Sequence, residues 1–368
     1  MGSMKSQQRW GGLLVNGGLL LLVLTWTIPT FGLFVSSFRS REAIQSSGWW
    51  NIFPHRAFET VEVINPADLG LDATGPMVID GVETNFEELR ESGITTPAGK
   101  YYRWVGNRRI GRIEVQEESW TVDWDFSLEN YRQVLSGKEF EYERPDGTVE
   151  VIPGDDFVSA FLNSLAVAVP ATVIPILVAA FAAYGFAWMR FPGRRLLFIM
   201  VVALLVVPLQ IALVPILKDF RTLAINGTFL AMWLAHTGFG LPLATYLLFN
   251  YISQLPRETL ESAFIDGASH FTVFRRLILP LSVPALASFA IFQFLWVWND
   301  YLVALIFLGG NPETKVITQR LADIIGSRGN DWHLLTAGAF LTMLLPLIVF
   351  FGLQRFFVRG LLAGSVKG

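Results

Sequence analysis

The sequence contains no cysteine and few charged residues. Without cysteine, a disulfide framework, a thiolate metal site and a cysteine nucleophile are all excluded. Only 16% of the residues are charged and 52% are hydrophobic, whereas soluble globular proteins carry about 25% charged residues. The apolar residues also gather in long blocks, which indicates that much of the chain lies in lipid.

Several kinds of functional site are missing as well. The chain has no G-x-x-x-x-G-K-[ST] motif, so it cannot hold nucleotide phosphates as a P-loop does. Its four histidines are scattered without the spacing of metal ligands, and a net charge of −3 gives no support for a nucleic-acid partner. We therefore expect no catalytic residue, no metal site and no cofactor on this chain.

Six blocks are long enough for a membrane-crossing helix, which needs about 20 apolar residues. Lys5 and Arg9 precede the first block, as in a secretory signal, but its apolar core is too long and no cleavage site follows Phe34. We therefore predict an all-α polytopic membrane protein. Its six transmembrane helices would cover 12–35, 157–188, 196–217, 228–249, 281–308 and 334–357.

Charge in the short loops predicts the orientation. Lysine and arginine are more numerous in the loops that would share a side with the N-terminus, and such loops are usually cytoplasmic. Both termini are then expected in the cytoplasm. The expected divisions are 1–11 (cytoplasmic), 12–35 (first helix), 36–156 (extracytoplasmic insertion), 157–357 (five-helix core) and 358–368 (cytoplasmic tail).

The 36–156 insertion is acidic and contains strand-like runs at 101–105 and 112–116. Glycine-containing turns at 106–107 and 146–147 favour a small β-rich domain. A helix is expected over 125–137, with Ser127 as its N-cap and Asn130 at the capping-box position. The insertion could brace another protein, cover a channel mouth or stabilise a complex, and its residues do not decide among these.

A polar segment, 256–280, stands between the fourth and fifth apolar blocks. Pro256 suits the first turn of a helix, and acidic residues near that end favour the helix dipole. Three- and four-residue spacing predicts that one helical face carries several apolar residues and that Gly267 bends the helix. The face residues are Phe264, Gly267, Phe271, Phe274 and Ile278. A helix that rests on lipid headgroups would show the same pattern.

The run ESAFIDGA, with Leu279-Pro280 further on, resembles the EAA loop of binding-protein-dependent ABC transporter permeases. Ser262 departs from the second consensus residue. SLENY (127–131), FLNSLAVA (161–168) and FVRGLLAGSVKG (357–368) are similar to the smaller, six-span permease of the maltose type. SFRSREAIQSSGWW (37–50) and the long first loop resemble α-glucoside permeases, because the maltose-type connection across 41–124 is usually far shorter.

This resemblance implies a permease subunit of an ATP-driven importer in the inner membrane of a bacterial cell, and such a subunit is not itself an enzyme. Its partners would be a second permease, two ATPase subunits that hold ATP and magnesium, and a substrate-binding protein that delivers an oligosaccharide, such as an α-glucoside. ATPase closure would move the coupling loop and switch the spans between two states. The residues implied in coupling are Glu258, Glu261, Ala263, Phe264, Asp266, Gly267, Ala268, Phe271, Phe274 and Pro280.

The C-terminal tail resembles one that reaches into the ATPase interface, although a frayed terminus would have the same composition. Its contact residues would be Gly360, Gly364, Ser365 and Lys367. The loop 309–333 would dock on the substrate-binding protein through a tip at Gly326, Ser327, Arg328 and Asp331, placed there by position alone. A solvated loop is the alternative.

Polar groups inside a span often mark a pathway. In FQFLWVWND, the spacing places Gln293, Trp296 and Asp300 on one face, where an indole could stack on a sugar and polar groups could bind hydroxyls. Asn299 adjoins them. Gln210, between Pro208 and Pro215, is a weaker candidate. Hydrogen bonding between helices is the alternative role for such side chains.

Two other classes of protein fit the composition. An ion-coupled secondary transporter would show internal repeats and charges at mid-membrane, and only Asp300 comes near this. A membrane receptor could sense a ligand through 36–156, but it would leave the ESAFIDGA segment without a role.

Overall fold

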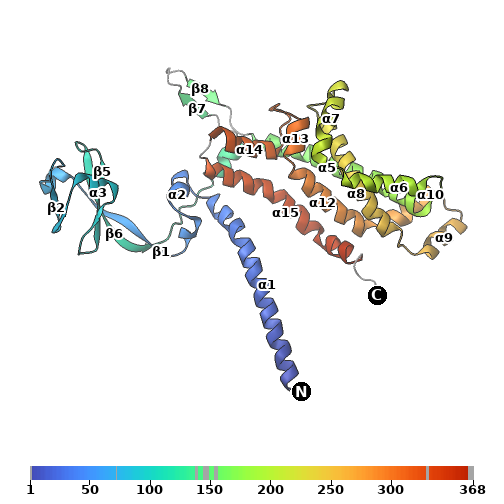
Figure 1. The fold of residues 1–368 in the computed structure, drawn as a ribbon, viewed down its shortest axis with the longest axis horizontal. Helices are drawn as coiled ribbons and strands as arrows, with labels where there is room; N and C mark the ends of the chain where they lie inside the picture. Colours follow the sequence, from blue (N-terminus) through green and yellow to red (C-terminus); the bar gives the residue numbers. More distant parts are fainter. Residues whose placement is uncertain are drawn as a thin grey trace. The chain divides into compact units, whose positions relative to one another are not determined.

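A computed structural model describes residues 2–71, 73–136, 140–143, 149–152, 156–328 and 331–363. The chain divides into two compact units (Figure 1). One is helical and comprises residues up to Arg41 together with the chain from Ser127 onward, and the other is residues 42–126. Each unit is described by itself.

The helical unit follows the chain from the first apolar block to the C-terminal helix. Its elements are α1 (Gly2–Ser36), α4 (Glu129–Ser136), β7 (Phe140–Glu143), β8 (Val149–Ile152), α5 (Phe157–Trp188), α6 (Arg194–Ala203), η3 (Leu204–Val206), α7 (Leu209–Thr222), α8 (Phe229–Ile252), α9 (Arg257–Ile265), α10 (His270–Val273), the π-helix η4 (Phe274–Ile278), α11 (Leu279–Leu281), α12 (Val283–Trp298), α13 (Leu302–Phe307), α14 (Ile317–Arg328) and α15 (Trp332–Ala363).

Two apolar clusters hold this unit together at opposite ends of α5 and α8. The first contains Phe157, Met232 and Trp298, with residues of α13, α14 and α15. The second contains Tyr184 and Ile252, with residues of α9, α10 and η4. The segment 256–280 and the segment 309–333 therefore belong to different ends of the helix bundle.

The predicted count of six spans is not confirmed. By length and composition, three described helices could cross a membrane: Gly11–Ser36, Phe157–Trp188 and Trp332–Phe356. Two bent pairs raise the number to five if each is one span, namely Arg194–Val206 with Leu209–Thr222 and His270–Leu281 with Val283–Trp298. The fourth predicted span, 228–249, corresponds to the continuous helix α8.

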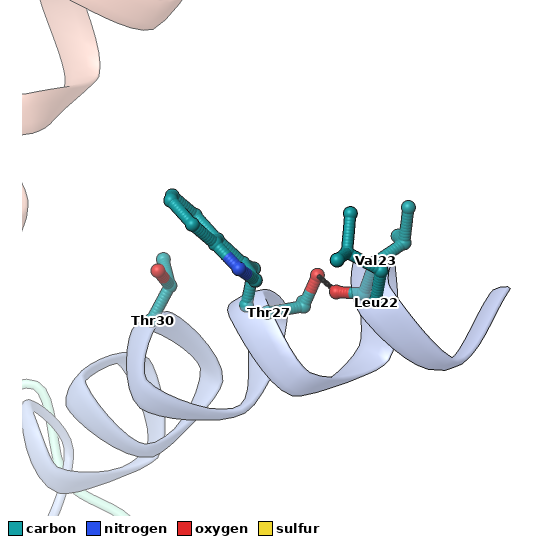
Figure 2. A pocket seen from close by; sticks show the side chains of 5 residues that line it. Leu22, Val23, Thr27 and Thr30 are labelled. Carbon is teal, nitrogen blue, oxygen red and sulfur yellow. Dashed lines mark hydrogen bonds between the residues drawn. The ribbon is translucent and has the colours of Figure 1, made fainter. Parts of the chain in front are cut away.

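Helix α1 stands apart from the other helices for most of its length (Figure 1). Only 11% of its apolar window is buried, and near its end Phe34 contacts Phe340 of α15. Figure 2 shows a shallow hollow on this one helix, where the Thr27 hydroxyl donates back to the Val23 carbonyl at 2.7 Å. None of the predicted site residues lines this hollow; its lining residues are Leu22, Val23, Trp26, Thr27 and Thr30.

Pro170 and Pro346 each leave a carbonyl group that a side chain of a neighbouring helix satisfies. A proline has no N–H, so the carbonyl four residues before it loses its helical donor. Pro170 frees the carbonyl of Ala166, which accepts from the Trp233 indole at 2.9 Å. Pro346 of α15 frees the carbonyl of Thr342, which accepts from the Trp298 indole, also at 2.9 Å.

The unit 42–126 is built mainly from β-strands. Its elements are α2 (Arg41–Ser46, which begins one residue earlier), η1 (Trp49–Ile52), β1 (His55–Ile64), η2 (Pro66–Leu69), β2 (Met77–Ile79), β3 (Val82–Thr84), α3 (Phe86–Glu91), β4 (Ile94–Thr95), β5 (Lys100–Gly106) and β6 (Gly111–Thr121). The four-stranded sheet has the order β1-β6-β5-β4, and β2 and β3 form a separate hairpin.

The strands predicted at 101–105 and 112–116 are confirmed as β5 and β6, with the predicted turn beginning at 106–107. The turn predicted at 146–147 lies outside the described residues. Alternation buries Tyr102 and Trp104 on one face of the sheet. Asp80 and Gly81 both have positive φ angles in the β2–β3 turn, as a two-residue hairpin requires.

The start of α4 is tied to the end of α1. The Ser127 hydroxyl accepts from the Glu129 N–H at 3.0 Å, as predicted for a cap. Asn130 has a different role from the one its position suggested: it is buried and donates to the carbonyls of Ser37 and Arg39 at 2.9 and 2.8 Å. The backbone N–H of Ser127 donates to Phe38 at 2.8 Å.

Candidate coupling segment and translocation pathway

Gly267 ends α9 in a left-handed conformation. Its φ angle is +81°, which side chains other than glycine rarely adopt. The Gly267 N–H donates to Phe264 at 3.0 Å and the Ala268 N–H donates to Ala263 at 2.9 Å, the two bonds of a Schellman cap. A Cβ at Gly267 would meet nothing within 4 Å, so its backbone angle, and not crowding within this chain, requires glycine.

The predicted helical face of 256–280 is found only in part. The chain breaks between α9 and α10, so the three- and four-residue spacing does not continue across Gly267. Phe274 is 3% exposed and Ile278 is buried, whereas Phe271 is 62% exposed. Phe264 is half-buried against the second apolar cluster. Phe271 therefore points away from the side on which Phe274 packs.

Acidic and apolar side chains share the solvent-exposed surface of this segment. Glu258, Glu261 and Asp266 are exposed, as is Pro280, while Ala263 and Ala268 are half-buried. Ile265 is 85% exposed and was not predicted as a site residue. The sequence carried one signal for this exposure. Ile265 follows Ser262 by three residues, so the two lie on the same, polar side of α9. The surface combines carboxylates with two uncovered apolar side chains, Ile265 and Phe271.

The predicted fifth span, 281–308, is not one helix. The chain bends by 72° between His270–Leu281 and Val283–Trp298, where Ser282 separates α11 from α12. α12 then ends at Trp298, and α13 begins at Leu302. Prolines at 280 and 284 remove backbone donors around the first break, and Asp300 lies in the second.

Gln293, Trp296 and Asp300 all lie against His236 of α8, but they differ in exposure. Gln293 is 2% exposed and donates to the carbonyls of Ala171 and His236 at 3.1 and 3.2 Å. Pro175 removes the helical donor of the Ala171 carbonyl, so the Gln293 amide replaces that donor. This is the helix-bonding role given as the alternative. Trp296, in contrast, is 36% exposed.

Asp300 and Asn299 form the break after α12. The Asp300 carboxylate accepts from the Val303 N–H at 2.9 Å and so caps α13. The Asn299 amide donates to the carbonyl of Leu295 at 2.8 Å. Gln210 is exposed in the first turn of α7, after the 104° bend between η3 and α7. Gln210 therefore lies on a different element from the other four candidates.

His236 joins this region and was missed from the sequence. It is fully buried in α8, and its ring lies edge-to-face with Trp296 at 5.5 Å. Neither ring nitrogen has a hydrogen-bond partner among the described residues. Its Nε2 lies 4.0 Å from the Asp300 carboxylate. A lone histidine in an apolar block gave no spacing signal, because its neighbours come from another helix.

The 309–333 segment is not a plain loop, since 12 of its residues form α14. The Asn163 amide donates to the carbonyls of Glu313 and Lys315 at 2.8 and 2.9 Å. Asp331 lies 3.6 Å from the Arg41 guanidinium. Gly326, Ser327 and Arg328 are the last residues of α14.

The tail begins within α15, which contains Gly360 and ends at Ala363. Gly364, Ser365 and Lys367 lie outside the described residues. Among the described residues, no group of three or more histidine, aspartate or glutamate residues could hold a metal ion.

Comparisons with known proteins all point to one protein family. A family described as "Binding-protein-dependent transport system inner membrane component" matches residues 164–362. The chain is 47% identical to the alpha-glucoside transport system permease protein AglG of Rhizobium meliloti, over 100% of this chain and 99% of AglG. It is 46% identical to the osmoprotective compounds uptake permease protein GgtD of Synechocystis sp., over 97% of this chain and 93% of GgtD.

The fold matches that of a chain in the crystal structure of a bacterial ABC transporter involved in the import of the acidic polysaccharide alginate. The TM-score is 0.58 at 15% identity, with 94% of this chain and 96% of that chain covered. The resemblance carried by the ESAFIDGA segment is thereby confirmed, and the chain is a transport subunit and not an enzyme. This chain belongs to the binding-protein-dependent ABC transporter permeases, the multi-pass inner-membrane components of ABC importers.

Proposed function

We propose that this permease imports an α-glucoside, such as maltose, trehalose, sucrose or a glucosyl-polyol, delivered by a substrate-binding protein. The observation that carries the proposal is the 47% identity with AglG over the whole chain, including the 42–126 unit. The similarity to GgtD, which is named as an uptake permease, supports an import role for this chain. ATP and magnesium would be held by two separate ATPase subunits, and a second permease would complete the pathway.

The segment from Pro256 to Pro280 would couple ATP hydrolysis to the membrane helices. Exposed carboxylates at Glu258, Glu261 and Asp266 would meet polar groups of the ATPase, while Phe271 would enter an apolar cleft. Ile265, at 85% exposure, joins Phe271 in this role, because uncovered apolar side chains of this size usually mark a contact surface. Four residues that belong to the second apolar cluster or pack against it would hold the segment against the helix bundle: Phe264, Phe274, Ala263 and Ala268.

Sugar would pass near the break that follows α12. Trp296 offers a partly exposed indole, and Asn299 and Asp300 add an amide and a carboxylate nearby. A sugar-binding site needs aromatic faces, which pack against the C–H surface of the sugar. It also needs hydrogen-bonding groups, which bind the sugar hydroxyls. Gln210 remains a weaker candidate. Gln293 is given a supporting role here, because both of its recorded hydrogen bonds hold neighbouring helices.

The proposed orientation places both termini and the coupling segment in the cytoplasm. The Gly326–Asp331 region and the 42–126 unit would then face the substrate-binding protein outside. The placement of the coupling segment and α14 at opposite ends of α5 and α8 supports this arrangement. Gly360, Gly364, Ser365 and Lys367 would reach the ATPase from the C-terminal tail.

The test is ATP hydrolysis by the importer reconstituted in lipid, with this chain, the second permease, the ATPase and the binding protein. We expect one of maltose, trehalose, sucrose or a glucosyl-polyol to stimulate hydrolysis. Gly267→Arg should abolish this stimulation, because a bulky cation would stand where the ATPase seats. Gly267→Asn is the matched control, since asparagine tolerates the left-handed conformation and the site has room for it.

Stimulation that survives Gly267→Arg would overturn the coupling assignment. An assembled complex that none of the four sugars stimulates would overturn the α-glucoside assignment. Equal loss in the Asn and Arg variants would show that the ATPase approaches the Gly267 backbone too closely for any side chain.

A further inference from the structure

The backbone between α9 and α12 has two weak points. Between α9 and α10, the chain turns through Gly267 at a φ of +81°. Between α11 and α12 it bends by 72° at Ser282. A displacement of α9 could be absorbed at either joint before it reached α12. A rigid link to the membrane helices therefore has to come from side chains.

A row of five rings supplies such a link. Phe264 of α9 lies edge-to-face with His270 of α10, with ring centroids 4.9 Å apart. His270 lies 6.0 Å from Tyr184 of α5, which lies 5.7 Å from Phe274. Phe274 then stacks on Phe181 of α5 at 4.1 Å. The row passes from α9 through His270 of α10 to α5, and so it bypasses both backbone joints.

One hydrogen bond fixes the middle of this row. The Tyr184 hydroxyl and His270 Nδ1 are 2.8 Å apart. Tyr184 is only 2% exposed, and a buried tyrosine hydroxyl needs a partner. Within the described chain, no other side chain–side chain hydrogen bond joins α9 or α10 to a membrane helix.

His270 is placed where it can connect α9 to α5. It is the first residue of α10, directly after Ser269, whose hydroxyl caps that helix. Its ring is exposed on one side and contacts both Phe264 and Tyr184. Apolar contacts in the second cluster have no preferred direction, whereas the hydrogen bond between Tyr184 and His270 has a defined geometry.

We infer that His270 and Tyr184 are positioning residues that transmit the movement of α9 to α5. This inference rests on the proposed coupling role of the segment, and it assigns the path inside this chain. The rings carry the displacement because close-packed side chains deform little. The hydrogen bond keeps His270 in register with Tyr184 while α9 moves.

The experiment uses the reconstituted importer and measures sugar transported per ATP hydrolysed. His270→Ala removes both the ring and the bond, Tyr184→Phe removes only the hydroxyl, and His270→Gln keeps a hydrogen-bonding group. Tyr246→Phe of α8 is the matched control, since this half-exposed tyrosine makes no hydrogen bond within the described residues. ATPase co-purification is measured for each variant.

We expect the transport-to-hydrolysis ratio to fall about two- to tenfold in Tyr184→Phe, the factor that one net hydrogen bond represents. His270→Ala should lower the ratio further, and His270→Gln should recover part of it. ATPase co-purification and basal hydrolysis should stay unchanged in all of them. Tyr246→Phe should behave as the unmodified chain.

Two results would overturn the inference. One is an unchanged ratio in His270→Ala while Gly267→Arg still abolishes stimulation, which would leave the coupling role intact and reject this path. The other is a parallel fall of transport, hydrolysis and co-purification, which would make the pair a folding element only. Full activity of Gly267→Arg would instead reject the proposed coupling role itself.

Discussion

At the scale of single residues, Gly267 acts through its backbone angle and Gln293 through its side chain. Gly267 occupies an open site and is required by its φ of +81°, which the ESAFIDGA pattern indicated as a bend. The role of Gln293 was harder to predict. An amide within an apolar block is compatible with a sugar contact, and only the nearby carbonyl freed by Pro175 shows that it bonds helices.

Asp156 gives a prediction at this scale. Its carboxylate accepts from the Ser159 N–H at 2.9 Å and caps α5. Hydrogen bonds from the hydroxyl and backbone N–H of Ser159 hold the pKa of Asp156 below its ordinary value of 3.8. Because the folded pKa is lowered, this stabilisation is present above the ordinary value and is lost as the pH falls through the folded one.

Asp156→Ala should therefore lower the free energy of unfolding by about 1 kcal/mol at neutral pH. The difference from the unmodified chain should shrink in acid, below pH 3.8. Thermal melting of the detergent-solubilised protein, followed by helical circular dichroism, measures both effects. Asp156→Asn, which keeps the accepting oxygen, is the control and should lose less. Equal melting of the Ala variant and the unmodified chain would contradict the prediction.

At the scale of elements, prolines organise the contacts between membrane helices. Pro170, Pro175 and Pro346 each free a carbonyl, and each carbonyl accepts from a side chain of another helix. Unsatisfied backbone groups are costly in lipid, so these three bonds select helix neighbours. The donors are Trp233, Gln293 and Trp298.

The pairing of Pro175 with Gln293 can be tested by a double-mutant cycle. Gln293→Leu should destabilise the protein by about 1 to 3 kcal/mol, because the Ala171 carbonyl is left buried without a donor. Pro175→Ala restores a helical N–H, so the same Gln293→Leu change should cost less in that background. Denaturant unfolding in detergent micelles measures the four free energies. Equal costs in the two backgrounds would show that Gln293 acts independently of Pro175.

At the scale of the whole molecule, each of the two units has its own stabilising contacts. The 42–126 unit has its own apolar cluster, which includes Leu89, Ile113 and Trp104. Within the helical unit, the Ser127 N–H bonds to Phe38, and Asn130 bonds to Ser37. The two chain ends from which the insertion departs are therefore held together by the helical unit.

Replacing 42–126 with a short glycine-serine linker should leave the helical unit assembled. We expect unchanged ATPase co-purification, because the contacts of α4 with the end of α1 do not involve the insertion. Stimulation by the binding protein is measured in the same preparation and reports what the insertion contributes. Loss of the protein from the membrane would refute the independence of the helical unit. Asn130→Ala in the full chain tests the contact between α4 and the end of α1, and it should weaken the association of these two elements.

The sequence by itself determined the membrane location, the β-containing insertion and the polar segment between apolar blocks. These follow from local signals: apolar length, strand alternation and a motif within one stretch of chain. The tertiary structure decided which side of 256–280 is exposed, that 281–308 is broken into two helices, and that Gln293 bonds α5 and α8. The first and the last depend on groups supplied by distant segments, such as the carbonyl of Ala171 or the ring of Tyr184, and periodicity within one segment carries no information about them. The break in 281–308 is built from local hydrogen bonds of Asn299 and Asp300, which apolar length alone does not register.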